Sequence, residues 1–131
     1  MAALDEMRKH AAQLTEASGV VVNVVEDGGR MIVILAAVPL PVNAFRLRET
    51  DLMFIADLMY PLSAMDMFWT EMDVVRPDGS VPQGAETIEQ YVGRSWRRFS
   101  WHRNGVWNPA GNPLLDHFSF AESRLALEVR R

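Results

Sequence analysis

Ser100 and His102 form a pair whose residue types and spacing could support nucleophilic catalysis. A serine hydroxyl is a weak nucleophile that needs an adjacent general base, and a histidine can supply one. Residues two positions apart share a face in a strand, whereas in a helix they do not. Two interpretations remain open. Either Ser100 and His102 act as nucleophile and base, or Ser100 is an ordinary loop serine and His102 forms a local hydrogen bond.

The histidines and carboxylates do not follow a recognisable metal-binding pattern. Three histidines, or two with a carboxylate, can hold zinc, and the sequence contains His10, His102 and His117, with Asp116 beside the last. No two histidines stand four positions apart, and adjacent residues on a helix diverge by about 100°. The sequence also has no cysteine and no glycine-rich phosphate loop. We therefore expect no metal site and no cofactor.

The segment 94–107 interleaves arginines with large aromatic residues. Its members are Arg94, Trp96, Arg97, Arg98, Phe99, Trp101, Arg103 and Trp107. Arginine contacts phosphates and tryptophan stacks on bases, so the segment could bind single-stranded nucleic acid. The same residue types anchor protein interfaces, and arginines can also cover tryptophans that pack as a small core. The composition leaves these three interpretations open.

The first part of the chain predicts a helix followed by a β-hairpin. Apolar residues recur at helical spacing from Leu4 to Leu14, which indicates an amphipathic helix that ends near Ser18. Apolar runs at 20–25 and 31–38 are separated by a segment with two glycines. This pattern is typical of two strands joined by a tight turn.

The rest of the chain predicts two further strands and a second helix. We expect strands at 51–58 and 65–70, and no regular pattern is clear from 71 until Asn112. Asn112 and Pro113 suit the N-cap and the first position of a helix. The candidate catalytic pair and the Arg/Trp segment therefore lie in a long irregular stretch before the last helix.

Composition indicates one globular domain spanning 1–131. Hydrophobic residues make up 49% of the 131 residues and charged residues 23%, as in ordinary folded domains. The net charge of −4 argues mildly against general nucleic-acid binding. No stretch of 18 apolar residues is present and the N-terminus is unlike a secretory signal. We expect a cytoplasmic protein that does not contact a membrane.

The order of elements and several motifs resemble the ubiquitin-conjugating (E2, UBC) fold, and in particular the bacterial group called prokaryotic E2 family E. Tyr60-Pro61 matches the Tyr-Pro pair that ends the third strand of the fold, and Trp107-Asn108-Pro109 matches a Trp-Ser-Pro-like step before its second helix. Further similar motifs are Asp66-Met67-Phe68, Gly93-Arg94-Ser95-Trp96 and Ser100-Trp101-His102. The resemblance spans about residues 20–127. It implies an α+β, UBC-like fold: an N-terminal helix, a four-stranded antiparallel meander, an irregular active-site-like segment and a C-terminal helix.

The positions that carry the family's chemistry depart from its pattern. The resemblance places the catalytic cysteine shortly before Trp107, at Phe99 or Ser100, but the sequence has no cysteine. The asparagine of the His-Pro-Asn motif also has no counterpart in 93–98. An oxyester at Ser100 would react less readily with amines than a thioester, and Ser100 could instead be an engineered replacement for a cysteine. Whether the chain is an enzyme stays open, with Ser100 and His102 as the candidate catalytic residues.

The resemblance implies a role in a bacterial ubiquitin-like protein modification pathway. The partners would be a ubiquitin-like protein, an E1-like activating enzyme, or both. In such proteins the first helix contacts the activating enzyme through basic residues. We expect a non-catalytic or non-classical partner whose candidate binding residues are Arg8, Lys9, Arg97, Arg98, Trp101 and Trp107. The alternative is a module that binds single-stranded nucleic acid through 94–107, although nucleic acid is the less favoured partner.

Overall fold

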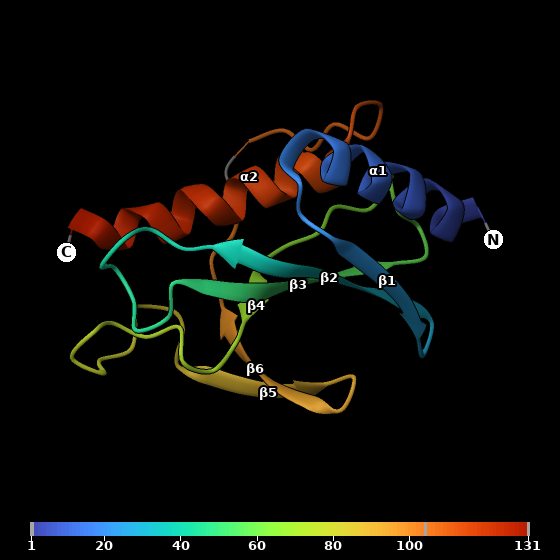
Figure 1. Cartoon of the computed structure of the whole chain (residues 1–131). Helices are drawn as coiled ribbons and strands as arrows, with labels where there is room; N and C mark the ends of the chain where they lie inside the picture. Colours follow the sequence, from blue (N-terminus) through green and yellow to red (C-terminus); the bar gives the residue numbers. More distant parts are fainter. Residues whose placement is uncertain (1, 104, 131) are drawn as a thin grey trace.

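The computed structural model describes residues 2–103 and 105–130 and shows two helices on one side of an antiparallel sheet (Figure 1). The helices are α1 (Ala2–Ser18) and α2 (Pro113–Ala126), and a 3-10 turn (Leu127–Arg130) follows α2. The strands are β1 (Val22–Asp27), β2 (Arg30–Pro39), β3 (Glu49–Asp57), β4 (Phe68–Thr70), β5 (Thr87–Tyr91) and β6 (Arg94–Phe99). Their order across the sheet is β1-β2-β3-β4-β6-β5. The predicted α+β fold is confirmed. Neither described helix is long and apolar enough to cross a membrane.

The first helix and the first hairpin follow the hydrophobic pattern. Met7, Ala11 and Leu14 are buried on one face of α1, as the helical spacing predicts. The helix ends at Ser18, and the next residue, Gly19, has a positive φ of 78° and donates its N–H to the Thr15 carbonyl. The hairpin joins β1 to β2 through the two glycines at 28–29.

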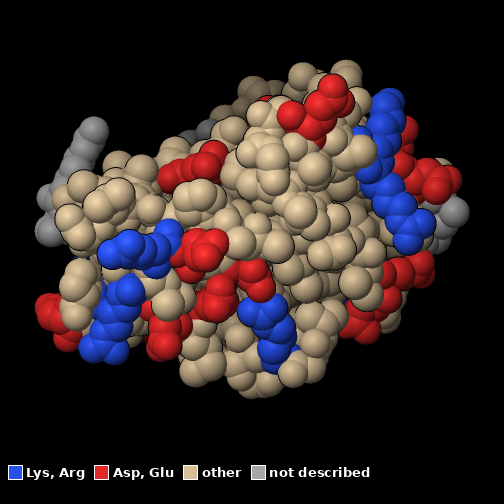
Figure 2. Space-filling model, in the orientation of Figure 1, with Lys and Arg blue, Asp and Glu red and all other residues tan. Residues whose placement is uncertain are grey.

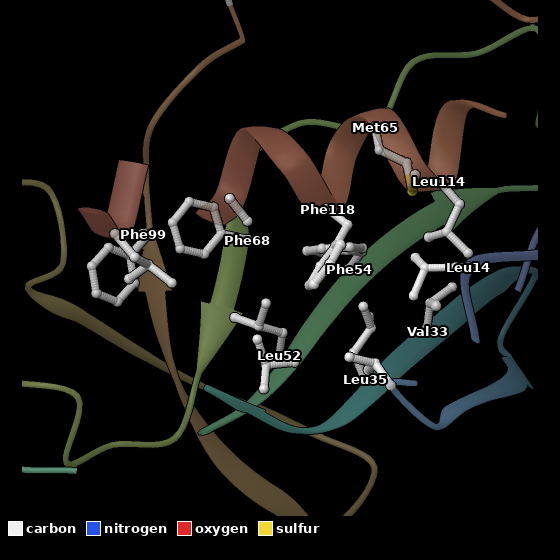
Figure 3. Packing of buried hydrophobic residues seen from close by; sticks show 14 of the residues in the cluster. Leu14, Val33, Leu35, Leu52, Phe54, Met65, Phe68, Phe99, Leu114 and Phe118 are labelled. Carbon is white, nitrogen blue, oxygen red and sulfur yellow. The ribbon is translucent and has the colours of Figure 1, made fainter. Parts of the chain in front are cut away.

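The main core fills the space between the helices and the sheet. Figure 3 shows Phe118 of α2 pointing toward Phe54 of β3, and Leu114 of α2 pointing toward Leu14 of α1. Leu14 of α1 joins the same buried cluster. Asn112 caps α2 because its side-chain oxygen accepts a hydrogen bond from the Leu115 N–H, and Pro113 occupies the first turn. This core fixes α2 against the middle of the sheet.

The fourth strand is shorter than its predicted range of 65–70. It begins at Phe68 because Met67 has a positive φ of 60°, which interrupts the extended backbone. The Met67 carbonyl accepts a hydrogen bond from His117 of α2 instead of joining the ladder. The residues before Met67 therefore form a loop that α2 holds in place.

The stretch expected to lack regular structure contains a β-hairpin. Strands β5 and β6 pair through a turn at Val92 and Gly93, both with positive φ, and β6 then pairs with β4. The sheet thus has two strands more than the four-stranded meander. The segment before this hairpin, 71–86, and the segment after it, 100–112, contain no strand or helix among their described residues.

A second, smaller core lies on the face of the sheet opposite the helices. Its buried members are Ile32, Met53, Trp69 and Trp96. The Arg94 guanidinium lies 4.1 Å from the centre of the Trp96 ring and forms an ion pair with Asp51 at 3.0 Å. Arginine covers the tryptophan here, which is the packing interpretation of this part of the Arg/Trp segment.

Candidate functional site

Ser100 lies directly after β6 and is held by hydrogen bonds of its own segment and a neighbouring loop. Its N–H donates to the Gly84 carbonyl at 2.9 Å, and its Oγ accepts from Arg98 Nε at 2.9 Å. Within the described residues no hydrogen bond joins Ser100 to His102. The hydroxyl therefore faces a guanidinium donor, which cannot take up its proton. The structure does not bring the two residues together as a nucleophile and its base.

His102 pairs with a carboxylate from a distant part of the sequence. Its Nδ1–H donates to Asp66 Oδ2 at 2.5 Å, while Asp66 Oδ1 accepts from the Arg103 N–H at 3.3 Å. This arrangement assigns the proton of a neutral ring to Nδ1 and leaves Nε2 as an acceptor. The His102 side chain is 73% exposed, so a bound molecule could reach Nε2. The Asp66–His102 pair can thus accept or donate a proton at the surface.

A depression of about 250 Å³ adjoins this pair, and Trp107 forms one of its walls. The Trp107 indole N–H donates to the Pro61 carbonyl at 2.7 Å, which fixes the ring against the loop after β3. The Arg103 guanidinium lies 5.0 Å from the centre of the same ring. The depression therefore combines a proton-transfer pair with a cation held over an aromatic ring.

His117 of α2 is hydrogen-bonded to the loop between β3 and β4 that carries Asp66. Its Nε2–H donates to the Met67 carbonyl at 2.7 Å, and its Nδ1 faces Arg103 Nη1 at 3.5 Å. Burial is the main cause that lowers the pKa of His117, to about 4, and the nearby positive charge of Arg103 acts in the same direction. His117 is therefore neutral at pH 7 and serves as a buried link between α2 and the loop.

The Tyr60-Pro61 step is positioned by a buried contact with α1. The Tyr60 hydroxyl and His10 Nδ1 lie 2.6 Å apart, and His10 Nε2 is 3.5 Å from a Glu6 carboxylate oxygen. Burial lowers the pKa of His10 and raises that of Tyr60. A neutral His10 with its proton on Nε2 lets the hydroxyl donate to Nδ1. This contact anchors the loop that carries the depression.

The arginines of β6 are committed to contacts within the molecule. Arg97 donates from Nε to the Met72 carbonyl at 2.8 Å and from Nη1 to the Ala85 carbonyl at 2.7 Å. Arg98 forms an ion pair with Glu89 at 3.0 Å. The Arg97 contacts attach the β5–β6 hairpin to the segment 71–86, and the Arg98 ion pair joins β6 to β5. The predicted use of Arg97 and Arg98 in partner binding would require these contacts to be exchanged.

The remaining predicted binding residues differ in their accessibility. Arg8 and Lys9 lie exposed on α1. Trp101 and Trp107 are half-buried, and the Arg124 guanidinium lies 4.4 Å from the centre of the Trp101 ring. Arg8 and Lys9 are thus available to a partner without any rearrangement, while each tryptophan presents only part of its ring.

Charges on the face seen in Figure 2 are mixed, since acidic and basic side chains lie next to one another over its lower half. A nucleic-acid site would instead present a basic stripe. Among the residues that the structure describes, no three histidine, aspartate or glutamate side chains are placed to hold a metal ion. The sequence had marked His102, Trp101 and Trp107, but it gave no signal for Asp66 as the partner of His102.

The comparison with sequence families gives one match that spans nearly the whole chain. The model of prokaryotic E2 family E matches residues 8–128, a range that includes the Asp66–His102 pair and most of both helices. The searches of curated proteins and of solved structures gave no significant match. The matched range contains the Tyr60-Pro61 step and Trp107, which the structure joins by a hydrogen bond. The chain therefore belongs to prokaryotic E2 family E.

Proposed function

We propose that this chain is an E2-like component of a prokaryotic ubiquitin-like modification pathway, and that it binds a pathway partner without carrying the modifier as a thioester. Family membership supports the pathway. The observation that supports the non-catalytic role is the hydrogen bonding around Ser100, where no base contacts the hydroxyl within the described residues. Its hydroxyl accepts a hydrogen bond from Arg98, and the nearby histidine is bonded to Asp66.

The chemistry of thioester transfer requires a thiolate, and none of the 131 residues is a cysteine. A serine would need a base to take its proton in the step that forms an ester. A guanidinium has donors and no acceptor, so Arg98 cannot act as that base. The Ser100 hydroxyl therefore joins Arg98 to the end of β6, where it supports the hairpin rather than chemistry.

The basic pair on α1 supports the partner side of the proposal. Arg8 and Lys9 are exposed, and α1 packs beside β1 and α2, so the surface around these two residues has a fixed shape. Arg8 also borders a depression of about 360 Å³ between α1 and β1. In this proposal these two cations contact acidic groups of an E1-like activating enzyme or a ubiquitin-like protein.

The test is the intact mass of the protein after incubation with ATP and the activating enzyme and ubiquitin-like protein of the same genome. We expect no adduct on the wild-type chain or on Ser100→Ala, although the partner still binds. An adduct that resists thiol reductant and disappears in Ser100→Ala would establish an oxyester and contradict the non-catalytic role. An adduct confined to Ser100→Cys would show that the site retains the geometry but has no nucleophile.

Partner binding is measured separately by isothermal titration calorimetry. The double variant Arg8→Glu, Lys9→Glu should weaken binding by about tenfold or more, because it places two acids opposite the acidic groups of the partner. Arg30→Glu, which reverses the charge of a part-exposed arginine at the start of β2, is the matched control. Equal affinity for the double variant and the wild type would remove α1 from the proposed interface.

A further inference from the structure

A cavity of about 740 Å³ lies outside the site described above, between the β2–β3 connection and the turn at Pro77. Its volume falls within the range of about 300–1,000 Å³ that is common for ligand sites. Arg46 and Arg48 both line this cavity, and no aspartate or glutamate does. The cavity is therefore basic although the whole chain carries a net charge of −4.

Within the described part of the chain, the guanidinium groups of Arg46 and Arg48 are paired with no carboxylate. Neither guanidinium forms an ion pair or a hydrogen bond with a residue in 2–103 or 105–130. Four other arginines of the chain, by contrast, pair with carboxylates. These are Arg30, Arg76, Arg94 and Arg98. Two unneutralised cations at one cavity are a common way to bind an anionic group, because guanidinium forms paired hydrogen bonds with carboxylates.

The backbone that carries these arginines is fixed on both sides. The Leu40 N–H donates to the Arg48 carbonyl at 2.9 Å and closes the base of the loop. The Arg46 N–H donates to the Val75 carbonyl at 2.9 Å and ties the loop to the segment 71–86. The Arg46 guanidinium also lies against Gly79, where an added Cβ would come within 2.7 Å of Nη2. Pre-positioned cations lose less freedom when a ligand binds.

Apart from Asn43, the remaining lining residues of the cavity are apolar, and they differ in how deeply they are buried. Leu40 and Phe45 belong to the main core and provide a fixed floor. Val42 is 83% exposed and stands among the lining residues, where it offers apolar surface that no described element covers. A ligand that complements this cavity would carry a negative group for the arginines and an apolar group for the floor.

We propose that this cavity binds an extended acidic segment of a partner protein, in which a carboxylate lies next to an apolar side chain. A nucleotide fits less well, because the lining has no exposed aromatic ring for the base and no helix N-terminus for the phosphates. The inference stands on the cavity and does not depend on the pathway proposed above.

The test selects peptides from a random display library on the folded protein and measures the enriched peptides by fluorescence anisotropy. Selected sequences should place aspartate or glutamate beside an apolar residue. Replacing their acids with the matching amides should weaken binding by about tenfold or more. Arg46→Gln and Arg48→Gln should have the same effect, and binding should weaken as salt is raised. Both arginines are exposed, so circular dichroism should show unchanged folding.

Arg30→Gln, which removes an arginine at the start of β2 that does not line this cavity, is the control and should leave peptide affinity unchanged. The proposal is overturned if no selected peptide depends on Arg46 or Arg48. It is also overturned if ATP or inorganic phosphate displaces the peptide at micromolar concentration, since the cavity would then be a small-anion site. Failure here leaves the proposed pathway role intact, because that role is tested through Arg8, Lys9 and the mass of the Ser100 variants.

Discussion

The substitution His117→Gln separates the structural role of His117 from its titration. In the structure the ring is fully buried, packs edge-on against Phe54 and donates from Nε2 to the Met67 carbonyl. A glutamine can place an N–H near the same carbonyl, but it does not titrate. The charged groups that face the ring are Arg103, close to Nδ1, and Asp66, farther away. The variant therefore isolates the effect of protonating one buried imidazole.

The magnitude follows from the pKa of His117, which burial lowers from 6.5 to about 4. Between these two values the unfolded chain binds a proton that the folded protein does not. Stability therefore falls as the pH drops from 6.5 to 4. At about 1.4 kcal/mol per pH unit, the full difference corresponds to about 3 kcal/mol of unfolding free energy. Above pH 6.5 the contribution of this group is constant.

The assay is urea unfolding followed by tryptophan fluorescence, at pH steps between 4 and 7 for the wild type and the variant. The variant will be less stable at pH 7 because glutamine fills less of the space, but its stability should fall by about 3 kcal/mol less than that of the wild type on acidification. A second non-titrating variant, His117→Asn, is the control and should show the same slope as His117→Gln. Parallel curves for the wild type and His117→Gln would refute the assigned protonation state.

Three further changes test other parts of the structure. Trp96→Ala removes a fully buried ring from the second core and should cost about 3–5 kcal/mol in urea unfolding, whereas a loss below about 1 kcal/mol would show that this core contributes little. Glu128→Gln weakens the 2.9 Å ion pair with Arg76 and should lower the unfolding free energy by about 1–2 kcal/mol, an effect that high salt should not reproduce in the wild type because the carboxylate is buried. Gly79→Ala strains a residue with φ of +89° and displaces Arg46, so thermal unfolding should show a loss of about 1 kcal/mol; an unchanged melting temperature would contradict the backbone geometry.

Much of the fold could be predicted because local patterns agreed with the tertiary structure. The spacing of Met7 and Leu14 and the capping pair at 112–113 determined the two helices. The β5–β6 hairpin could not be predicted in this way. Its turn uses Val92 at a positive φ of 46°, a conformation that β-branched residues rarely adopt, and strand β6 is rich in arginine. Contacts with residues distant in the sequence stabilise this strand pair, among them the second core, the hydrogen bonds of Arg97 and the packing of Phe99 in the main core.

The candidate site could be predicted only in its local part. The sequence identified the short segment containing Ser100 and His102, and it left a local role for the histidine open. Asp66 comes from the loop before β4, and nothing in the sequence near it points to His102. Strand β4 starts only after Met67, whose carbonyl accepts a hydrogen bond from His117 of α2 instead of pairing in the sheet. Contacts between three separate segments decide this geometry, so no pattern within one segment reveals it.

The short strand β4 has a consequence for how the molecule opens. It is three residues long and forms the connection in the sheet between β3 and β6. It pairs with β3 through only two residue pairs, whereas β2 and β3 pair over most of their length. Amide hydrogens of β5 and β6 should therefore exchange with solvent through a partial opening that leaves β1 to β3 and the helices protected. In this prediction the sheet, although continuous in space, opens as two cooperative units joined at β4.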